Sequence, residues 1–138
     1  MSTEEQLSQE EITYNILLNI RNTLDVMVEQ QCKEDFLTFV RKVAPTLITD
    51  WHMGRHIEVL SDKLQKVVEG KIKRLMVFLP PRSSKSVICS KLFPAWYIGR
   101  RPQSEILTVS HSDQLASDFG RSVRDLVNYD LFNTVFPS

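Results

Sequence analysis

The sequence predicts an α/β fold in which a helical N-terminal arm precedes a β-α-β-α unit with parallel strands. Two short apolar runs, at about 74–79 and 105–109, predict the strands, because a central parallel strand is covered on both faces and is nearly all apolar. A helical spacing of apolar residues follows each run. A right-handed crossover between the two strands makes them parallel.

Two helices are predicted in the N-terminal arm. Apolar residues at helical spacing predict the first over about 9–29, with one apolar stripe that is expected to pack on the domain or on a partner. Asp35 is a candidate N-cap for a short second helix. Pro45 is expected to end that helix, because the residue before a proline disfavours the helical region. We therefore divide the chain into a helical segment, 1–45, and a domain that covers 46–138.

Three further helices are predicted within that domain. The first spans about 55–69, and Gly70 follows it at the position where a glycine often ends a helix. The second begins near Ser84, and Pro94 is expected to kink or shorten it. The third follows Ser110–Asp113, a segment that resembles a capping box with Asp in place of Glu.

The segment between the first strand and its helix carries the strongest functional signal. Residues 79–86 read Leu-Pro-Pro-Arg-Ser-Ser-Lys-Ser, and the order of strand, small-residue loop, Lys-Ser and helix is typical of a phosphate-binding loop, or P-loop. Lys85 is expected to reach the β- and γ-phosphates of a nucleotide, and the Ser86 hydroxyl is expected to ligate Mg²⁺. The backbone N–H groups of residues 83–86 would surround the phosphates.

The match to the Walker A pattern G-x-x-x-x-G-K-[ST] is incomplete. Leu79 occupies the position of the first glycine and Ser84 that of the second. A flexible Pro/Ser turn with a solvated Lys85 is the alternative interpretation. The position of the loop, after a predicted strand and before a predicted helix, favours phosphate binding.

Residues 80–86 resemble the PPR-x-G-K-S loop of the large terminase subunit of tailed bacteriophages, the ATPase motor and nuclease that packages viral DNA. Segments within 51–74 resemble the family's sequence before the loop, and segments within 106–125 resemble its second strand and following helix. The resemblance covers roughly residues 36–138. It departs from the family at Ser84, where glycine is usual, and the Ser84 Cβ is expected to restrict how closely the backbone wraps a phosphate.

The resemblance implies a set of nucleotide-binding residues. By analogy with the family's early arginine, Arg82 would touch the γ-phosphate, so Lys85 and Arg82 are the candidate catalytic residues; a surface arginine is the alternative. Trp51 or His56 would line the adenine pocket, with Gln65 as a further candidate, whereas a packed tryptophan and a surface histidine are the alternative. The complete set expected to contact ATP is Pro81, Arg82, Ser83, Ser84, Lys85, Ser86, Trp51 and His56, with Ser86 as the Mg²⁺ ligand.

The resemblance also implies a function and partners. The chain would be the N-terminal portion of a terminase large subunit, in which ATP and Mg²⁺ power DNA translocation into the procapsid, in the cytoplasm of the infected bacterial host. Double-stranded DNA, the portal or procapsid and the small terminase subunit are the implied partners of the complete protein, and a homo-oligomer is expected. No membrane association is expected, because no apolar run approaches the ~20 residues of a transmembrane helix.

Whether the chain is an enzyme by itself stays open at this stage. The family's acidic strand, which holds Mg²⁺ and activates water, and its nuclease domain have no counterpart in the sequence, so we expect weak nucleotide binding without turnover. One alternative function is another phosphate-loop protein of sulfotransferase-like or kinase-like type. A second is a non-enzymatic adaptor in which the helices over 9–29 and 55–69 bind a partner and the loop is vestigial.

Charge is distributed unevenly along the chain. Residues 1–35 carry eight acidic and two basic side chains, whereas residues 36–138 carry nine acidic and fifteen basic ones. The basic part contains the loop, which is compatible with nucleotide or DNA contact, although a mixed solvated surface explains it equally well. Arg121 and Arg124, on the outer face of the last helix, are candidate DNA contacts or members of a solvated face.

Overall fold

The computed structural model describes the backbone of residues 3–137 and the side chains of residues 9–137. Helices take up 69% of the chain, and residues 3–137 contain no strand. The predicted α/β fold, a partial P-loop NTPase domain with parallel strands, is therefore wrong. The elements are α1 (Thr3–Glu34), α2 (Phe36–Leu47), α3 (Arg55–Val68), α4 (Lys85–Val87), the π-helical turn η1 (Ile88–Leu92), α5 (Phe93–Arg100), α6 (Asp113–Val127) and α7 (Asp130–Val135).

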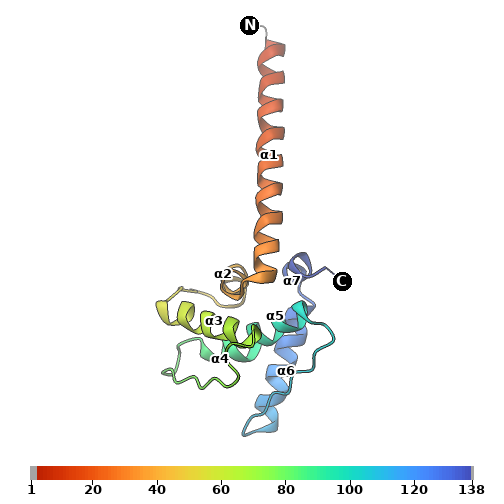
Figure 1. Ribbon diagram of the computed structural model, residues 1–138. Coiled ribbons are helices and arrows are strands. Elements are labelled where there is room, and N and C mark those ends of the chain that lie inside the picture. Colours follow the sequence, from red (N-terminus) through yellow and green to blue (C-terminus); the bar gives the residue numbers. More distant parts are fainter. Residues whose placement is uncertain (1–2, 138) are drawn as a thin grey trace.

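Both predicted strands, 74–79 and 105–109, are irregular segments that connect helices (Figure 1). Among the described residues, no backbone–backbone hydrogen bond outside the helices involves residues 73–83. A strand exists only through hydrogen bonds to a neighbouring strand, and an apolar composition does not supply that neighbour. Met76 and Phe78 are 83% and 86% exposed, while the residues that alternate with them pack against the core. Residues 74–79 therefore form an irregular segment that packs one of its sides against the core and exposes the other.

Helix α1 projects from the body of the molecule (Figure 1). It is longer than predicted at both ends, and its large apolar side chains between Ile12 and Val28 are 40–66% exposed. Of the two expected packings, the one on the domain is therefore wrong, while packing on a partner stays a prediction. Only the C-terminal end of α1, at Cys32, enters the core. No helix within residues 3–137 is long and apolar enough to cross a membrane.

Trp96 joins the end of α1 to the rest of the core. Its side chain is fully buried, its ring centroid lies 5.1 Å from that of Phe36, and its indole N–H donates to the Cys32 carbonyl at 2.8 Å. This carbonyl lies in the last turn of α1, where helix carbonyls lack partners within the helix. Residues from both sides of position 45 contribute to the core. Its buried apolar members are Cys32, Phe36, Phe39, Val40, Val43, Ala44, Ile57, Leu60, Leu64, Val68, Ile88, Leu92, Ala95, Trp96, Leu126, Phe132 and Val135.

Gln65 of α3 holds the junction between α1 and α2. Its amide nitrogen donates to the Glu34 carbonyl at 3.0 Å, and its amide oxygen accepts from the Phe36 N–H at 3.0 Å. These are backbone groups that the break between the two helices leaves without helical partners. Gln65 therefore fixes the direction in which α1 leaves the body.

The predicted N-cap of α2 is confirmed, and its predicted end is wrong. The Asp35 carboxylate accepts from the Thr38 N–H at 2.6 Å. The helix continues through Pro45 to Leu47. A proline in the last turn removes one helical hydrogen bond, and that loss is small enough for the packed apolar face of α2 to tolerate.

Sequence signals at the other helix ends were also informative. Gly70 ends α3 as predicted: it has φ +75°, its N–H donates to the Val67 carbonyl, and the Lys71 N–H donates to the Lys66 carbonyl. These two bonds form a Schellman motif. Helix α6 takes Ser112 rather than Ser110 as its N-cap, so the predicted capping box is displaced by two residues.

Helices α4, η1 and α5 form one uninterrupted helical run over 85–100. The expected kink or shortening at Pro94 takes the form of a π-helical turn just before it, in which the Phe93 N–H donates to the Ile88 carbonyl. A proline clashes with the carbonyl four residues earlier in an α-helix, and the wider π turn accommodates the ring. The run therefore continues past Pro94 to its end at Arg100.

Candidate functional site

The predicted phosphate loop forms a single continuous surface. Residues 79–87 line an open hollow of about 370 Å³. The loop enters from the irregular segment beside α3 and leaves into the helical run that begins at Lys85. Six of the eight residues predicted to contact ATP, Pro81 to Ser86, therefore lie together on this hollow.

Two loop residues have a backbone conformation that side chains other than glycine rarely adopt. Arg82 has φ +62°, and Ser84 has φ +59° with ψ 11°, in the left-handed region. Lys85, the next residue, begins the helix, and the Ser84 carbonyl accepts from the Ile88 N–H at 3.0 Å. A left-handed residue next to a right-handed one turns successive N–H groups toward one side, which makes a concave site for anions. Ser84 thus has the conformation that the missing glycine would provide.

Ser83 supplies an unused hydrogen-bonding group at the base of the loop. Its hydroxyl is buried and has no hydrogen-bond partner among the described residues. A buried polar group without a partner is unfavourable. Ser83 is among the residues that line the hollow, so a rotation of its side chain toward the hollow would let this hydroxyl donate to an oxygen of a bound phosphate.

The two basic side chains of the loop are available to an anion. Neither Arg82 nor Lys85 takes part in an ion pair within residues 9–137. Lys85 does act on Cys89, one turn further along: burial raises the pKa of the Cys89 thiol, and the Lys85 charge lowers it in part. The hollow is therefore lined by two basic residues without an ion-pair partner among the described residues and by Ser83, whose buried hydroxyl has no hydrogen-bond partner there.

Ser86 is exposed. The loop contains no acidic residue, and the described side chains, those of residues 9–137, include no group of three or more histidine, cysteine, aspartate or glutamate residues that could hold a metal ion. Mg²⁺ is commonly bound by one or two protein oxygens together with phosphate oxygens and water. Ser86 fits the role of a single protein ligand for Mg²⁺ that arrives with a nucleotide.

The two upstream candidates occupy different places. His56, in the first turn of α3, lies with Nε2 3.3 Å from the Ser83 carbonyl oxygen, so it meets the loop directly. Trp51 is half-buried against the core and does not line the hollow. The contact between His56 and Ser83 joins residues 27 positions apart, and no local pattern in the sequence indicates it.

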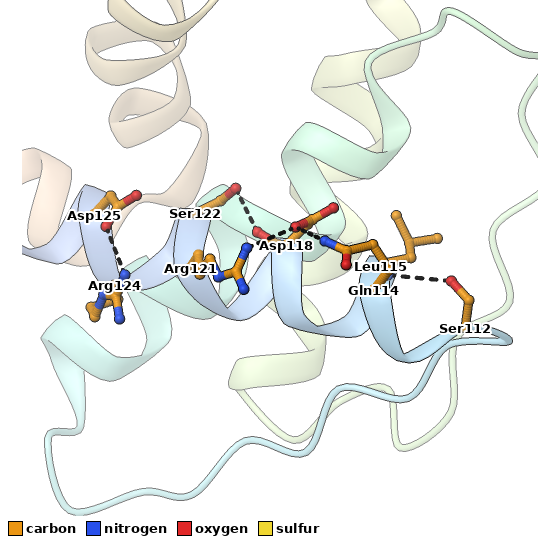
Figure 2. A network of polar contacts seen from close by, with 8 residues as sticks. All are labelled: Ser112, Gln114, Leu115, Asp118, Arg121, Ser122, Arg124 and Asp125. Carbon is orange, nitrogen blue, oxygen red and sulfur yellow. Dashed lines mark hydrogen bonds and ion pairs between the residues drawn. The ribbon is translucent and has the colours of Figure 1, made fainter.

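Arg121 and Arg124 lie on the exposed side of α6 and are engaged with neighbouring acids (Figure 2). Arg121 pairs with Asp118 at 3.5 Å, and Arg124 with Asp125 at 3.5 Å. Exposed pairs of this kind contribute little to stability, but each carboxylate offsets the charge that would attract a phosphate backbone. This arrangement favours the interpretation of a solvated face.

No protein-family model, curated protein or solved structure matches the chain. The resemblance to terminase large subunits thus rests on the residues of the loop and its flanking segments, and it stays a prediction.

Proposed function

We propose that this chain binds Mg²⁺-ATP through residues 79–86 and serves as the N-terminal portion of a phage DNA-packaging terminase large subunit, in the cytoplasm of the bacterial host. In that role ATP binding contributes to DNA translocation by the complete motor. The observation that carries the proposal is that one hollow is lined by Lys85 and by Ser83, whose buried hydroxyl has no hydrogen-bond partner among the described residues. The resemblance of residues 80–86 to the terminase loop is the reason for naming ATP as the ligand and the DNA-packaging motor as the assembly.

Each loop residue has a distinct part in the proposed site. Lys85 neutralises charge on the β- and γ-phosphates, and the N–H groups around Ser84 donate to their oxygens. The Ser83 hydroxyl donates to a phosphate oxygen, and Ser86 completes the coordination of Mg²⁺. Arg82, which is exposed and lines the same hollow, meets the γ-phosphate.

A calorimetric titration with Mg²⁺-ATP tests the proposal. The wild-type chain is expected to show saturable binding, and Lys85→Ala is expected to bind about 10- to 100-fold more weakly, because a charge-assisted hydrogen bond is lost. Lys91→Ala is the matched control, since Lys91 lies on the same helical run and lines a different hollow. Far-UV circular dichroism verifies that all three chains are folded. A folded wild-type chain that does not bind Mg²⁺-ATP refutes the proposal.

Ser83→Ala tests the observation on which the proposal rests. The variant removes a buried hydroxyl that has no partner, so the free energy of unfolding without ligand is expected to stay unchanged or to rise. Affinity for Mg²⁺-ATP is expected to fall about fivefold, the equivalent of one neutral hydrogen bond. An unchanged affinity would mean that the Ser83 hydroxyl does not meet the phosphate.

Helix α1 favours a second candidate function, the non-enzymatic adaptor. Its large apolar side chains between Ile12 and Val28 are exposed on a helix that leaves the body, and exposed apolar surface of this extent is typical of an interaction site. An adaptor would form a stable oligomer that does not respond to nucleotide. Analytical ultracentrifugation of wild type and Leu17→Gln/Leu24→Gln, with and without Mg²⁺-ATP, distinguishes the two functions.

A further inference from the structure

One histidine is the only polar link between the loop and the neighbouring helix. Among the described residues, the contact of His56 Nε2 with the Ser83 carbonyl oxygen, at 3.3 Å, is the single hydrogen bond that joins residues 79–87 to a part of the fold outside the helical run into which they lead. A carbonyl oxygen only accepts hydrogen bonds, so Nε2 is the protonated ring nitrogen in this contact.

The contact fixes the orientation of one peptide group. The Ser83 carbonyl and the Ser84 N–H belong to the same peptide, which is trans, so the two groups point in opposite directions. When the carbonyl is held toward α3, the Ser84 N–H is directed away from α3. A rotation of this peptide plane would change ψ of Ser83 and φ of Ser84 together.

The conformation of Ser84 shows why this peptide needs to be held. Its φ of +59° is unfavourable for a residue with a Cβ atom, and rotation of the preceding peptide is the simplest way to relieve it. A hydrogen bond to the Ser83 carbonyl opposes that rotation. The bond therefore maintains the left-handed residue that turns the loop N–H groups toward one side.

Gly54 gives an independent observation on the same contact. A Cβ atom added at Gly54 would lie 2.6 Å from Cε1 and 2.7 Å from Nδ1 of His56, so the imidazole lies directly over the glycine. Gly54 has φ −93° and ψ 154°, an extended backbone that any residue adopts. Glycine at this position thus serves the close approach of the His56 ring rather than the backbone.

We propose that His56 is a positioning residue for the phosphate loop: seated over Gly54, it donates from Nε2 to the Ser83 carbonyl and thereby aims the Ser84 N–H for anion binding. This inference rests on the proposed function, because an oriented Ser84 N–H group matters for binding only if the loop binds a phosphate. The contact and its effect on the loop backbone do not depend on any ligand. His56 meets the loop on its helix side, so it supports the site and does not itself contact the phosphate.

Three variants separate the hydrogen bond from helix stability. His56→Gln keeps a side-chain N–H donor, whereas His56→Phe keeps a ring and removes the donor. Gly54→Ser leaves His56 unchanged but places a Cβ where the ring lies, while the serine hydroxyl improves the N-cap of α3. A merely structural role predicts that Gly54→Ser is harmless; a positioning role predicts that it behaves like His56→Phe.

The first measurement is made without ligand, by NMR of ¹⁵N- and ¹³C-labelled protein. In His56→Phe and Gly54→Ser, the backbone signals of Ser83 and Ser84 are expected to shift and the Ser84 amide to exchange faster, whereas His56→Gln is expected to resemble wild type. Unchanged Ser83 and Ser84 signals in both disruptive variants overturn the inference, whatever the affinity for nucleotide.

The second measurement is the Mg²⁺-ATP titration. His56→Phe and Gly54→Ser are expected to bind about fivefold more weakly than wild type, in line with the loss of one oriented donor, and His56→Gln is expected to recover most of that loss. If the wild-type chain binds Mg²⁺-ATP and both disruptive variants bind it equally tightly, the inference is overturned and the proposed function stands. If the wild-type chain does not bind Mg²⁺-ATP, the proposed function is refuted. The NMR signals of Ser83 and Ser84 without ligand then decide whether His56 holds the loop.

Discussion

Replacing Ser84 by glycine is expected to stabilise the chain slightly, although the change removes a side chain. A residue with a Cβ atom in the left-handed region costs about 1 kcal/mol or somewhat more, and Ser84 is in that region with φ +59° and ψ 11°. Glycine adopts the same backbone without that cost. Its greater freedom in the unfolded chain offsets about 0.4–1 kcal/mol, so the free energy of unfolding should rise by about 0.5 kcal/mol.

Ser117→Gly is the matched control for this substitution. Ser117 is exposed in the middle of α6, where the backbone is right-handed. Glycine in a helix interior is less favourable than serine by about 0.5 kcal/mol. The same chemical change thus has opposite expected signs at the two positions, and the two variants should differ by about 1 kcal/mol.

Urea denaturation followed by far-UV circular dichroism measures both changes, provided that the slope of the transition is the same for all chains. Ser84→Gly should shift the midpoint to higher urea and Ser117→Gly to lower urea. If Ser84→Gly destabilises the chain as much as Ser117→Gly does, Ser84 is not left-handed in solution. Ser84 would then not replace the missing glycine of the loop.

Three further predictions follow from contacts elsewhere in the fold. Trp96→Phe leaves the buried Cys32 carbonyl without its 2.8 Å donor, and urea denaturation should show a loss of about 2 kcal/mol; a loss below about 0.5 kcal/mol would show that another donor replaces the indole. Gln65→Glu keeps an acceptor for the Phe36 N–H but loses the donor to the Glu34 carbonyl, so it should destabilise by about 1 kcal/mol. That loss should be larger at about pH 7 than at about pH 4.5, because a protonated carboxyl regains a donor; equal losses at both values would exclude this cause. Burial raises the pKa of the Cys89 thiol and Lys85 opposes this in part, so the reactive thiolate forms only at higher pH than usual. Alkylation of Cys89 at about pH 8 should be slower than that of free cysteine and slower again in Lys85→Ala, and an equal rate in the two chains would contradict the stated effect of Lys85.

Helix ends show how far local sequence signals extend. Asp35 and Gly70 act where they were predicted to act, because a cap uses groups within four residues of one another. Pro45 and Ser110 were misjudged by two residues each. Those boundaries depend on the packing of the apolar faces that follow or precede them, and the local pattern does not include that packing.

The loop divides in a similar way. The loop lies directly before a helix, as the sequence indicates. Residues 81–86 line one hollow, and their contact with a phosphate stays a prediction. Trp51 packs against the core, as in the alternative interpretation of a packed tryptophan, and its role toward adenine stays a prediction. His56 was selected for a family analogy with an adenine pocket, and the contact it makes is with the loop backbone. Its role toward adenine stays a prediction.

Features that arise within a few residues could be predicted from the sequence: most helices, two helix caps, and a Lys-Ser pair at the start of a helix after a loop. Whether the apolar runs at 74–79 and 105–109 become strands depends on the tertiary fold, because a strand requires hydrogen bonds to a second segment and none within residues 3–137 provides them. The tertiary fold also explains that the stripe of α1 stays exposed and that Trp96, Gln65 and His56 reach backbone groups far along the chain. The partners of such contacts lie roughly thirty to sixty residues away, where folding rather than local sequence brings them together.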